Sequence, residues 1–492
     1  MQQKQCIAII DSIKVYAKQN PTEAQVYEDW FQAVVNLRDA LPQDKRFDAY
    51  KYSGELRSVC AAMMGKMKTG EDVAKVYDII SRTYLFEAKD VFDSYCIYLE
   101  WNRAPEKKFY QPRRKVLRTV ANALQDLADD RLDLLAISMP PGCGKTALAI
   151  FYLTWLAGRN PDEPMLTGSH SNSFVRGVYD ECLRIFDKDG EYLWNDVFPD
   201  VTVSNTNAKD CRIDLGKRKR FETLEFTSIG TGNAGLYRAS TLLYCDDLVS
   251  GIEVALSKPR LDKLWETYTT DLRQRKIGNK CKELHIATRW SVHDVIGRLE
   301  QNYGDSDRNR FIVMPAMNEK DESNFDYDYG VGYSTETLRK QREVMDEMSW
   351  KALYMNQPVE REGLLFPADE LRYFNGVLPD GEPDRKLMVM DIAWGGGDFT
   401  ACPIAYVYGD AVFIPDLVFN NGDKTVTRPE VVGKIIQHKI NVVRGEANNG
   451  GDEYCDVVDS QLRQQGYHCS VRSQRAPSGQ SKLSRIIQYA PD

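Results

Sequence analysis

The stretch LLAISMPPGCGKTALA, residues 134–149, is the part of the sequence that best predicts the fold and the position of a functional site. An apolar run, 134–138, is typical of a buried strand, and a Gly-rich turn separates it from a run with helical composition. In phosphate-binding loops, N–H groups of the turn and of the helix N-terminus hold phosphates, while a lysine adds positive charge and a hydroxyl binds Mg²⁺. The stretch therefore predicts a nucleoside-triphosphate site formed by Pro141, Gly142, Cys143, Gly144, Lys145 and Thr146.

The loop departs from the usual pattern G-x-x-x-x-G-K-[ST] at its first position, where this chain has Met139. The alternative interpretation is an ordinary Gly-rich turn between a strand and a helix, with Lys145 on the surface. The small residue Cys143 fits either interpretation. The loop alone therefore leaves both open.

Composition limits the class of protein. A chain of 492 residues is too long for one core, so we expect two to four domains. Its net charge of −8 argues against a uniformly basic nucleic-acid binder, and its eleven cysteines form no C-x-x-C pair that would suggest a zinc site. We find no stretch of transmembrane length, and the N-terminal apolar run is short and broken by Asp11, unlike a signal peptide.

The second anchor is STLLYCDD, residues 240–247, an apolar strand that ends in two carboxylates. In Mg²⁺-dependent NTP hydrolysis, one acid holds the metal and another orients or deprotonates the attacking water. We assign the first role to Asp246 and the second to Asp247. A strand ending in Asp-Asp is common by itself, but its spacing after the loop suits a parallel α/β sheet.

Three further segments are candidates for contact with the nucleotide, and two of them have a second interpretation. Tyr110 and Gln111 either bind an adenine or form the first turn of a helix that begins near Pro112. Arg238, after a Gly-rich segment, is a candidate for contact with the γ-phosphate. Thr288 and Arg289, at the end of an apolar run, either sense the phosphate or lie at a surface strand end.

Composition shifts divide the chain. Helical spacing predicts a helical domain over 1–104, and the two anchors place an ATPase domain with a mainly parallel sheet at 105–366. Within it, 211–226 is predicted to form antiparallel strands whose basic run, 217–220, is either a solvated hairpin tip or a phosphate contact. Residues 367–384 have a linker composition.

Residues 385–492 begin a new pattern of strand, hairpin, helix and strand. Its first and last strands end in Asp391 and Glu446, and Asp398 precedes the hairpin. This order is that of a ribonuclease-H-like fold, in which carboxylates from neighbouring strands hold two metal ions for phosphodiester cleavage. We therefore predict a nuclease site with Mg²⁺ or Mn²⁺ bound by Asp391, Glu446 and Asp398.

With these motifs in place, residues 105–492 resemble the large terminase subunit of tailed double-stranded DNA bacteriophages. The most specific segments are GTGNAGLYRASTLLYCDDLVSG (230–251), ATRWSVHDVIGRL (287–299), YMNQPVEREGLLF (354–366) and Asp391 with GEANNGG (445–451). The resemblance assigns an adenine motif, a phosphate loop, metal-binding and catalytic acids, a coupling motif and nuclease ligands. These correspond to Tyr110 and Gln111, Lys145 and Thr146, Asp246 and Asp247, Thr288 and Arg289, and Asp391 and Glu446.

The resemblance leaves the arginine finger open. Arg238 matches a family Gly-Arg position, but Tyr237 replaces the Gly here, and Gly142 stands where many relatives have Arg. Arg159 and Arg176 are rival candidates.

The family implies a motor subunit that uses ATP and Mg²⁺ to move double-stranded DNA into a procapsid, with a metal-dependent nuclease that cuts concatemers. It implies a portal protein, a small terminase subunit and a homo-oligomeric ring as partners, and a location in the bacterial host cytoplasm and at the portal vertex, with no membrane. Two alternatives are a helicase-like or repair ATPase fused to a nuclease, and a scaffold whose ATP fold is a relic.

The family also supplies a third nuclease carboxylate well after a Lys-x-x-Arg-Ile segment, matched here by Lys482, Arg485 and Ile486. This sequence ends at Asp492. We therefore expect a truncated nuclease domain with an incomplete metal site, and a chain that hydrolyses ATP better than it cuts DNA.

Overall fold

The computed structural model describes residues 3–231, 237–358, 372–393, 398–447, 450–475 and 486. These residues belong to two compact units, Met1–Gly363 and Leu364–Asp492. Parts of the segments singled out above lie outside the described residues: 232–236, 359–366, 448–449, Lys482, Arg485 and Asp492. In the described residues, no helix is long and apolar enough to cross a membrane.

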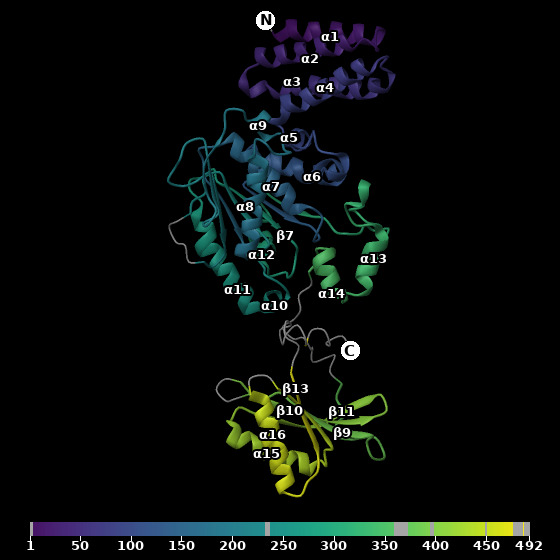
Figure 1. Cartoon of the computed structure of the whole chain (residues 1–492), viewed down its shortest axis with the longest axis vertical. Coiled ribbons are helices and arrows are strands. Elements are labelled where there is room, and N and C mark those ends of the chain that lie inside the picture. The colour runs from purple at the N-terminus through teal and green to yellow at the C-terminus, as the bar shows by residue number, and fades with distance from the viewer. Residues whose placement is uncertain are drawn as a thin grey trace. The chain divides into compact units, whose positions relative to one another are not determined.

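The first hundred residues are helical and form the purple and blue layers of Figure 1. Their helices are α1 (Gln3–Gln19), α2 (Ala24–Ala40), α3 (Phe47–Met63), α4 (Gly70–Ala88) and α5 (Phe92–Leu99). Their buried apolar residues belong to the same core cluster as those of the sheet that follows. Trp155, in a helix on that sheet, donates a hydrogen bond of 2.9 Å to the Ala88 carbonyl. Residues 1–104 thus share one compact unit with the sheet, and the predicted boundary at 104 stays a prediction.

The run LLAIS forms β1 (Leu134–Ser138) inside an eight-stranded sheet with the order β3-β4-β5-β2-β6-β7-β1-β8. Six strands, from β5 to β8 in that order, run parallel, and β3 and β4 extend one edge in antiparallel pairing. The other strands are β2 (Met165–Ser169), β3 (Val203–Asn207), β4 (Arg212–Leu215), β5 (Leu224–Ser228), β6 (Leu242–Asp246), β7 (Lys282–Ala287) and β8 (Asn309–Val313). The predicted α/β class with a mainly parallel sheet is confirmed.

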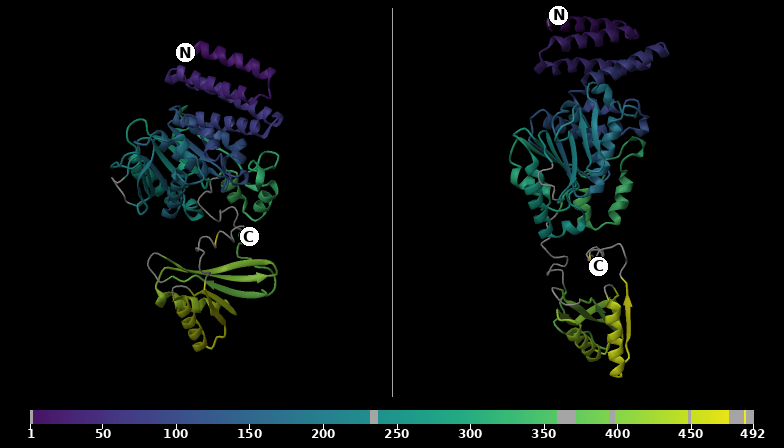
Figure 2. Two further views of the ribbon diagram at one scale, coloured as in Figure 1. Left: turned by 45° about the horizontal axis from the view of Figure 1, so that its top comes forward. Right: turned by 60° about the vertical axis from the view of Figure 1, so that its left-hand side comes forward.

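Helices cover both faces of this sheet, as Figure 2 shows. On one face lie α6 (Tyr110–Ala128), α7 (Lys145–Arg159) and α8 (Asn172–Phe186), whose buried apolar residues share a core cluster with Leu135 and Ile137 of β1. On the other face lie α11 (Lys258–Thr267), its π-helical extension Tyr268–Leu272, and α12 (Val295–Tyr303), which pack on Leu134 and Ala136. Burial on both faces explains why β1 is apolar at consecutive positions rather than at alternate ones. Shorter helices are α9 (Trp194–Val197), α10 (Ile252–Ala255), α13 (Thr335–Glu343) and α14 (Glu347–Ser349).

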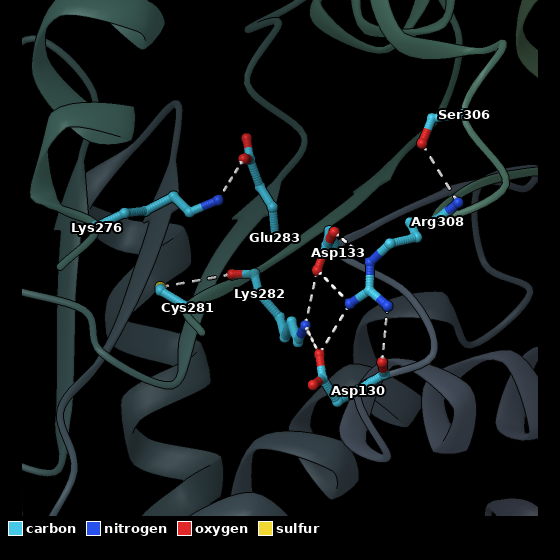
Figure 3. Close-up of polar contacts among 8 residues, drawn as sticks. All are labelled: Asp130, Asp133, Lys276, Cys281, Lys282, Glu283, Ser306 and Arg308. Atoms are coloured by element: carbon cyan, nitrogen blue, oxygen red, sulfur yellow. Dashed lines mark hydrogen bonds and ion pairs between the residues drawn. The ribbon is translucent and has the colours of Figure 1, made fainter. Parts of the chain in front are cut away.

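An ion-pair cluster joins the starts of β7, β1 and β8, as Figure 3 shows. Lys282, the first residue of β7, contacts Asp130 and Asp133, its Nζ lying 2.8 Å from an oxygen of Asp133. Arg308, just before β8, contacts the same two carboxylates, 2.9 Å from Asp130 and 2.6 Å from Asp133. Because the two cations share both acids, the cluster fixes the amino ends of the central strands relative to one another.

The second unit contains a five-stranded sheet with the order β11-β10-β9-β12-β13. Its strands are β9 (Arg385–Met390), β10 (Thr400–Tyr408), β11 (Ala411–Asn420), β12 (Val442–Glu446) and β13 (Ser470–Gln474). The first three pair antiparallel, and β12 and β13 continue parallel to β9. Two helices, α15 (Lys424–Gln437) and α16 (Gly451–Gln464), pack on one face of the sheet (Figure 2).

We predict that Lys282→Ala lowers the free energy of unfolding by about 1–3 kcal/mol, since the two Asp carboxylates then share one cation. The matched control is Lys280→Ala, an exposed residue in the same segment that removes the same charge and should stay within ~0.5 kcal/mol of the wild type. Thermal and urea unfolding of both variants measure the difference. Equal stability of the two variants would contradict a stabilising role of the ion-pair cluster.

Candidate functional site

The turn between β1 and α7 needs glycine at two positions. Gly142 and Gly144 have φ of 73° and 88°, in the left-handed region that glycine tolerates best. A Cβ at Gly142 would lie 2.5 Å from the Tyr333 hydroxyl, and one at Gly144 would lie 2.5 Å from the Phe109 ring. The turn is therefore held between two aromatic side chains, and the N–H groups of the first turn of α7, which lack helical partners, are available to an anion.

Lys145, the first residue of α7, joins this turn to two other strands. It is 7% exposed, its Nζ donates a 2.7 Å hydrogen bond to the Thr288 hydroxyl, and the same atom lies 3.8 Å from a carboxylate oxygen of Asp247. Thr288 follows β7 and Asp247 follows β6. The carboxyl ends of β1, β6 and β7 thus meet at one point, as the parallel sheet requires.

Asp246 is the last residue of β6 and is fully buried. One of its carboxylate oxygens accepts a hydrogen bond from the Tyr244 hydroxyl, and the other has no hydrogen-bond partner among the described residues. Burial and the neighbouring Asp247 raise the pKa of Asp246 to about 7. Tyr244, Lys145 and the Thr146 side chain act in the opposite direction and lower this pKa.

This arrangement fits Mg²⁺. A buried carboxylate oxygen without a protein partner lies beside the charge of Lys145 and the hydroxyl of Thr146, and hard oxygen ligands are those that Mg²⁺ prefers. Among the described residues, no group of three or more His, Cys, Asp or Glu side chains gathers to hold a metal. Mg²⁺ bound with a nucleotide does not need such a group, because phosphates and waters complete its octahedron.

Three contacts fix Asp247. Its carboxylate accepts a 2.8 Å hydrogen bond from the Thr288 N–H, its carbonyl lies 2.6 Å from Nδ1 of His170, and its own N–H donates to the Ile286 carbonyl. Its φ of 39° is in the left-handed region, which is costly for a residue other than glycine and is often found at functional sites. His170, which follows β2, was missed in the sequence because a single His after an apolar run carries no distinctive spacing.

A buried polar network extends from Asp247 along β7. A cavity of about 20 Å³, enough for one water, is lined by Asp247, Thr288 and His285. His285 is hydrogen-bonded to Glu283 at 3.1 Å. Glu283 in turn contacts Lys276 at 3.0 Å, and Figure 3 shows this second contact. Burial opposes ionisation of Glu283, but the contact with His285 and the charge of Lys276 keep its pKa below the usual range.

The predicted adenine residues are not both at the loop. Tyr110 is fully buried, its hydroxyl donates to Asp93 at 2.7 Å, and its N–H donates to Glu100. The prediction that Tyr110 stacks on a base is therefore wrong for this structure, whereas Gln111 is exposed. Phe109, the preceding aromatic, is the one that packs on the turn, a difference of one helical position that spacing cannot decide.

The two arginines predicted at the site, Arg238 and Arg289, contact other groups of the protein. Arg238 precedes β6 and lies 4.8 Å from the Phe221 ring, so a five-residue strand, roughly 16 Å, separates it from Asp246. Within one chain Arg238 therefore does not reach a phosphate at Lys145, and its assignment to the γ-phosphate stays a prediction. Arg289 is buried in an ion pair with Asp294, Nε to Oδ2 2.9 Å, and its predicted role in sensing the phosphate stays a prediction.

The two rival candidates, Arg159 and Arg176, also contact other groups of the protein. Arg159 packs on Trp155 at the far end of the fifteen-residue helix α7, roughly 20 Å from the loop. Arg176 donates to the Ala208 carbonyl at 2.5 Å. Arg113, which the sequence analysis did not single out, lies near the turn, its Cδ 3.5 Å from the position of a Cβ at Gly144. Its guanidinium donates to the carbonyls of Phe109 and Val331.

In the second unit, two predicted acids lie side by side. The neighbouring parallel strands β9 and β12 pair Met390 with Gly445, and Asp391 and Glu446 each follow by one residue. Equal register places both on the same face, with backbones ~5 Å apart. Asp398 is exposed and lies two residues before β10.

Comparisons with known proteins give a limited result. The sequence matches no protein-family model and no curated protein. Among solved structures, the large terminase of a thermophilic bacteriophage in complex with ADP is similar, with 13% identity and a TM-score of 0.37 over 77% of this chain and 85% of that chain. The large terminase of bacteriophage HK97 has 12% identity and a TM-score of 0.33 over 75% and 83%.

We predict that Gly144→Ala lowers the free energy of unfolding by about 1–3 kcal/mol and weakens nucleotide binding, because the new methyl meets the Phe109 ring at a left-handed φ. The matched control is Gly177→Ala, on the helix α8, where a Cβ has open space and should be neutral or stabilising. Thermal unfolding and binding of a fluorescent ATP analogue measure both. Wild-type behaviour of Gly144→Ala would show that the turn tolerates a side chain.

Proposed function

We propose that the chain is an ATPase whose catalytic centre is the meeting point of β1, β6 and β7. The observation that carries this proposal is the position of the Lys145 ammonium, 2.7 Å from the Thr288 hydroxyl and 3.8 Å from Asp247. Residues more than a hundred positions apart converge on the turn that leads into α7. A surface lysine on an ordinary Gly-rich turn would not be 7% exposed between two strand ends.

Each residue then has a role. The N–H groups of the turn and of α7 bind the phosphates, and Lys145 exchanges its present partners for phosphate oxygens. Thr146 and Asp246 are the protein groups that hold Mg²⁺, which when bound neutralises phosphate charge. Asp247, held by Thr288 and by the strained backbone, orients the attacking water and accepts its proton.

We propose that Thr288 couples the site to movement. It contacts Lys145 through its hydroxyl and Asp247 through its N–H, so withdrawal of Lys145 toward a phosphate breaks one contact and leaves the other. Arg289, the next residue, is tied to Asp294 at the start of α12. A movement of Thr288 is therefore transmitted through the ion pair of Arg289 and Asp294 to α12.

The biological role proposed is packaging of viral DNA. The support is the order of motifs in the sequence, from the phosphate loop to the Asp-Asp strand, the Thr-Arg strand end and a second unit with paired acids. In this role the partners are double-stranded DNA, a portal protein, a small terminase subunit and further copies of this chain in a ring. The chain works in the cytoplasm of the bacterial host and at the portal vertex. Arg238 and Arg159 lie away from Lys145, and the guanidinium groups of Arg176, Arg289 and Arg113 are bound to other protein groups, so we assign the arginine finger to a neighbouring subunit.

For the second unit we propose a ribonuclease-H-like nuclease. Three antiparallel strands followed by two parallel ones, with Asp391 and Glu446 in register on adjacent strands, support it. Asp391 and Glu446, whose backbones lie ~5 Å apart on neighbouring strands, suit a shared Mg²⁺ or Mn²⁺, which when bound would activate water and stabilise the leaving oxygen. Asp398 is the proposed additional ligand.

We expect Lys145→Ala to reduce ATP turnover to background while leaving thermal unfolding within a few degrees of wild type. Asp247→Asn should lower kcat by ~10²–10⁴ with little change in nucleotide affinity, because the water loses its base. The control is Lys188→Ala, an exposed lysine on another part of the unit. Turnover by Lys145→Ala at the wild-type rate would exclude this site as the catalytic centre.

We expect Asp391→Asn to abolish any Mn²⁺-dependent cleavage of plasmid DNA and to leave ATP turnover unchanged. The control is Asp452→Asn, an exposed acid at the start of α16 in the same unit, which should cleave as the wild type does. Cleavage by both variants at equal rates would remove Asp391 from the nuclease site.

A further inference from the structure

The basic run in the turn between β4 and β5 is split by the fold into one inward and three outward side chains. We call residues 216–221 the basic turn. Lys219 points inward, where its Nζ forms a 2.8 Å ion pair with the fully buried Asp214 and donates to the carbonyls of Pro161 and Leu215. Lys219 therefore holds the turn in one conformation.

The other three cations of the basic turn, Lys217, Arg218 and Arg220, are exposed. In the described part of the chain, their side chains form no ion pair, and of the three only Arg220 lies against an aromatic ring, that of Phe221, at 5.3 Å. Because Lys219 fixes the turn, the three unpaired cations are held close together and repel one another. A flexible, solvated hairpin tip would let them move apart. An anionic partner would remove that cost.

The acids around the basic turn are already compensated. Asp214 is paired with Lys219, and Glu222 with Arg212 at 3.4 Å. Arg238 adds a fourth exposed cation, 4.8 Å from the Phe221 ring. Two exposed acids oppose them nearby, Asp162 beside Pro161 and Glu163, which accepts a hydrogen bond from Ser240. A local excess of positive charge thus stands out on a chain whose net charge is −8.

We propose that the basic turn contacts the phosphate backbone of double-stranded DNA. The inference rests on the proposed packaging function and adds a place for the DNA. Its three outward cations span at most ~10 Å of chain, a length over which a duplex presents about six phosphate charges.

Two features favour a duplex backbone over unpaired bases. The aromatic residue of the turn, Phe221, lies against two guanidinium groups and is not presented for base stacking, on which single-strand binders depend. The turn also lies at the amino ends of the parallel strands, whereas Lys145 lies beyond the carboxyl end of β1. DNA and nucleotide therefore bind without competing for the same atoms.

The test is the salt dependence of DNA binding without nucleotide. The variant is the triple change Lys217→Ala, Arg218→Ala and Arg220→Ala, and the probe is a blunt duplex of arbitrary sequence titrated between ~50 and ~200 mM salt. Each lost phosphate contact lowers the slope of log K against log salt by about 0.9, so the triple variant should lose ~2–3 in slope. The matched control removes three exposed lysines of the helical layer, Lys18, Lys66 and Lys68, and should keep the wild-type slope.

A second variant separates charge from shape. Arg218→Lys with Arg220→Lys keeps all three charges and should keep the slope. An unchanged slope in the triple alanine variant, an equal loss in the control, or stronger binding of a single strand than of the duplex would each overturn the proposal. The proposal would also be overturned if the triple alanine variant lost binding to an acidic peptide and kept wild-type binding to DNA.

The outcome is separable from that of the proposed ATPase. DNA binding is measured without nucleotide. If the wild type turns over no ATP and the triple variant still loses slope, the proposed ATPase activity is refuted and the DNA contact stands. In an active chain, the triple variant should keep its basal ATP turnover and lose stimulation by duplex DNA.

Discussion

The order β6-β7-β1 in a parallel sheet is the constraint on which the rest of the site depends. Parallel strands end at one edge, so a turn after β1, a carboxylate pair after β6 and a hydroxyl after β7 must lie together. Thr288 sits on the middle strand and contacts both neighbours, Lys145 by its hydroxyl and Asp247 by its N–H. The ion-pair cluster of Lys282 and Arg308 at the opposite edge keeps these strands in register.

Strands and helices around the two anchors were predictable because their signals are local. LLAIS and STLLYCDD are apolar runs closed by polar residues, and the structure has β1 and β6 at those places. The meeting of Lys145 with the Asp-Asp pair also follows from sequence, since parallel α/β order leaves few other arrangements. The acids after β9 and β12 became neighbours for the same reason.

Side-chain direction was the part that sequence could not give. Tyr110 and Phe109 are adjacent aromatics, and only the packing of α6, whose first N–H groups are held by Glu100, determines which one meets the turn. Arg238 and Arg289 were assigned from spacing, yet one precedes its strand and the other has a buried carboxylate partner. Met139 departs from the loop pattern because its side chain is fully buried in the core cluster, while its N–H bonds the Ala287 carbonyl.

Cys143 lies inside the turn between β1 and α7 yet is 1% exposed, and burial raises the pKa of its thiol to about 12. Because the thiolate is the reactive form, oxidants and alkylating reagents do not reach a reactive sulfur while the turn stays packed against Phe109 and Tyr333. The burial thereby protects this turn from oxidation of its cysteine. The same burial makes the sulfur a built-in reporter, since its modification rate follows how often the turn opens.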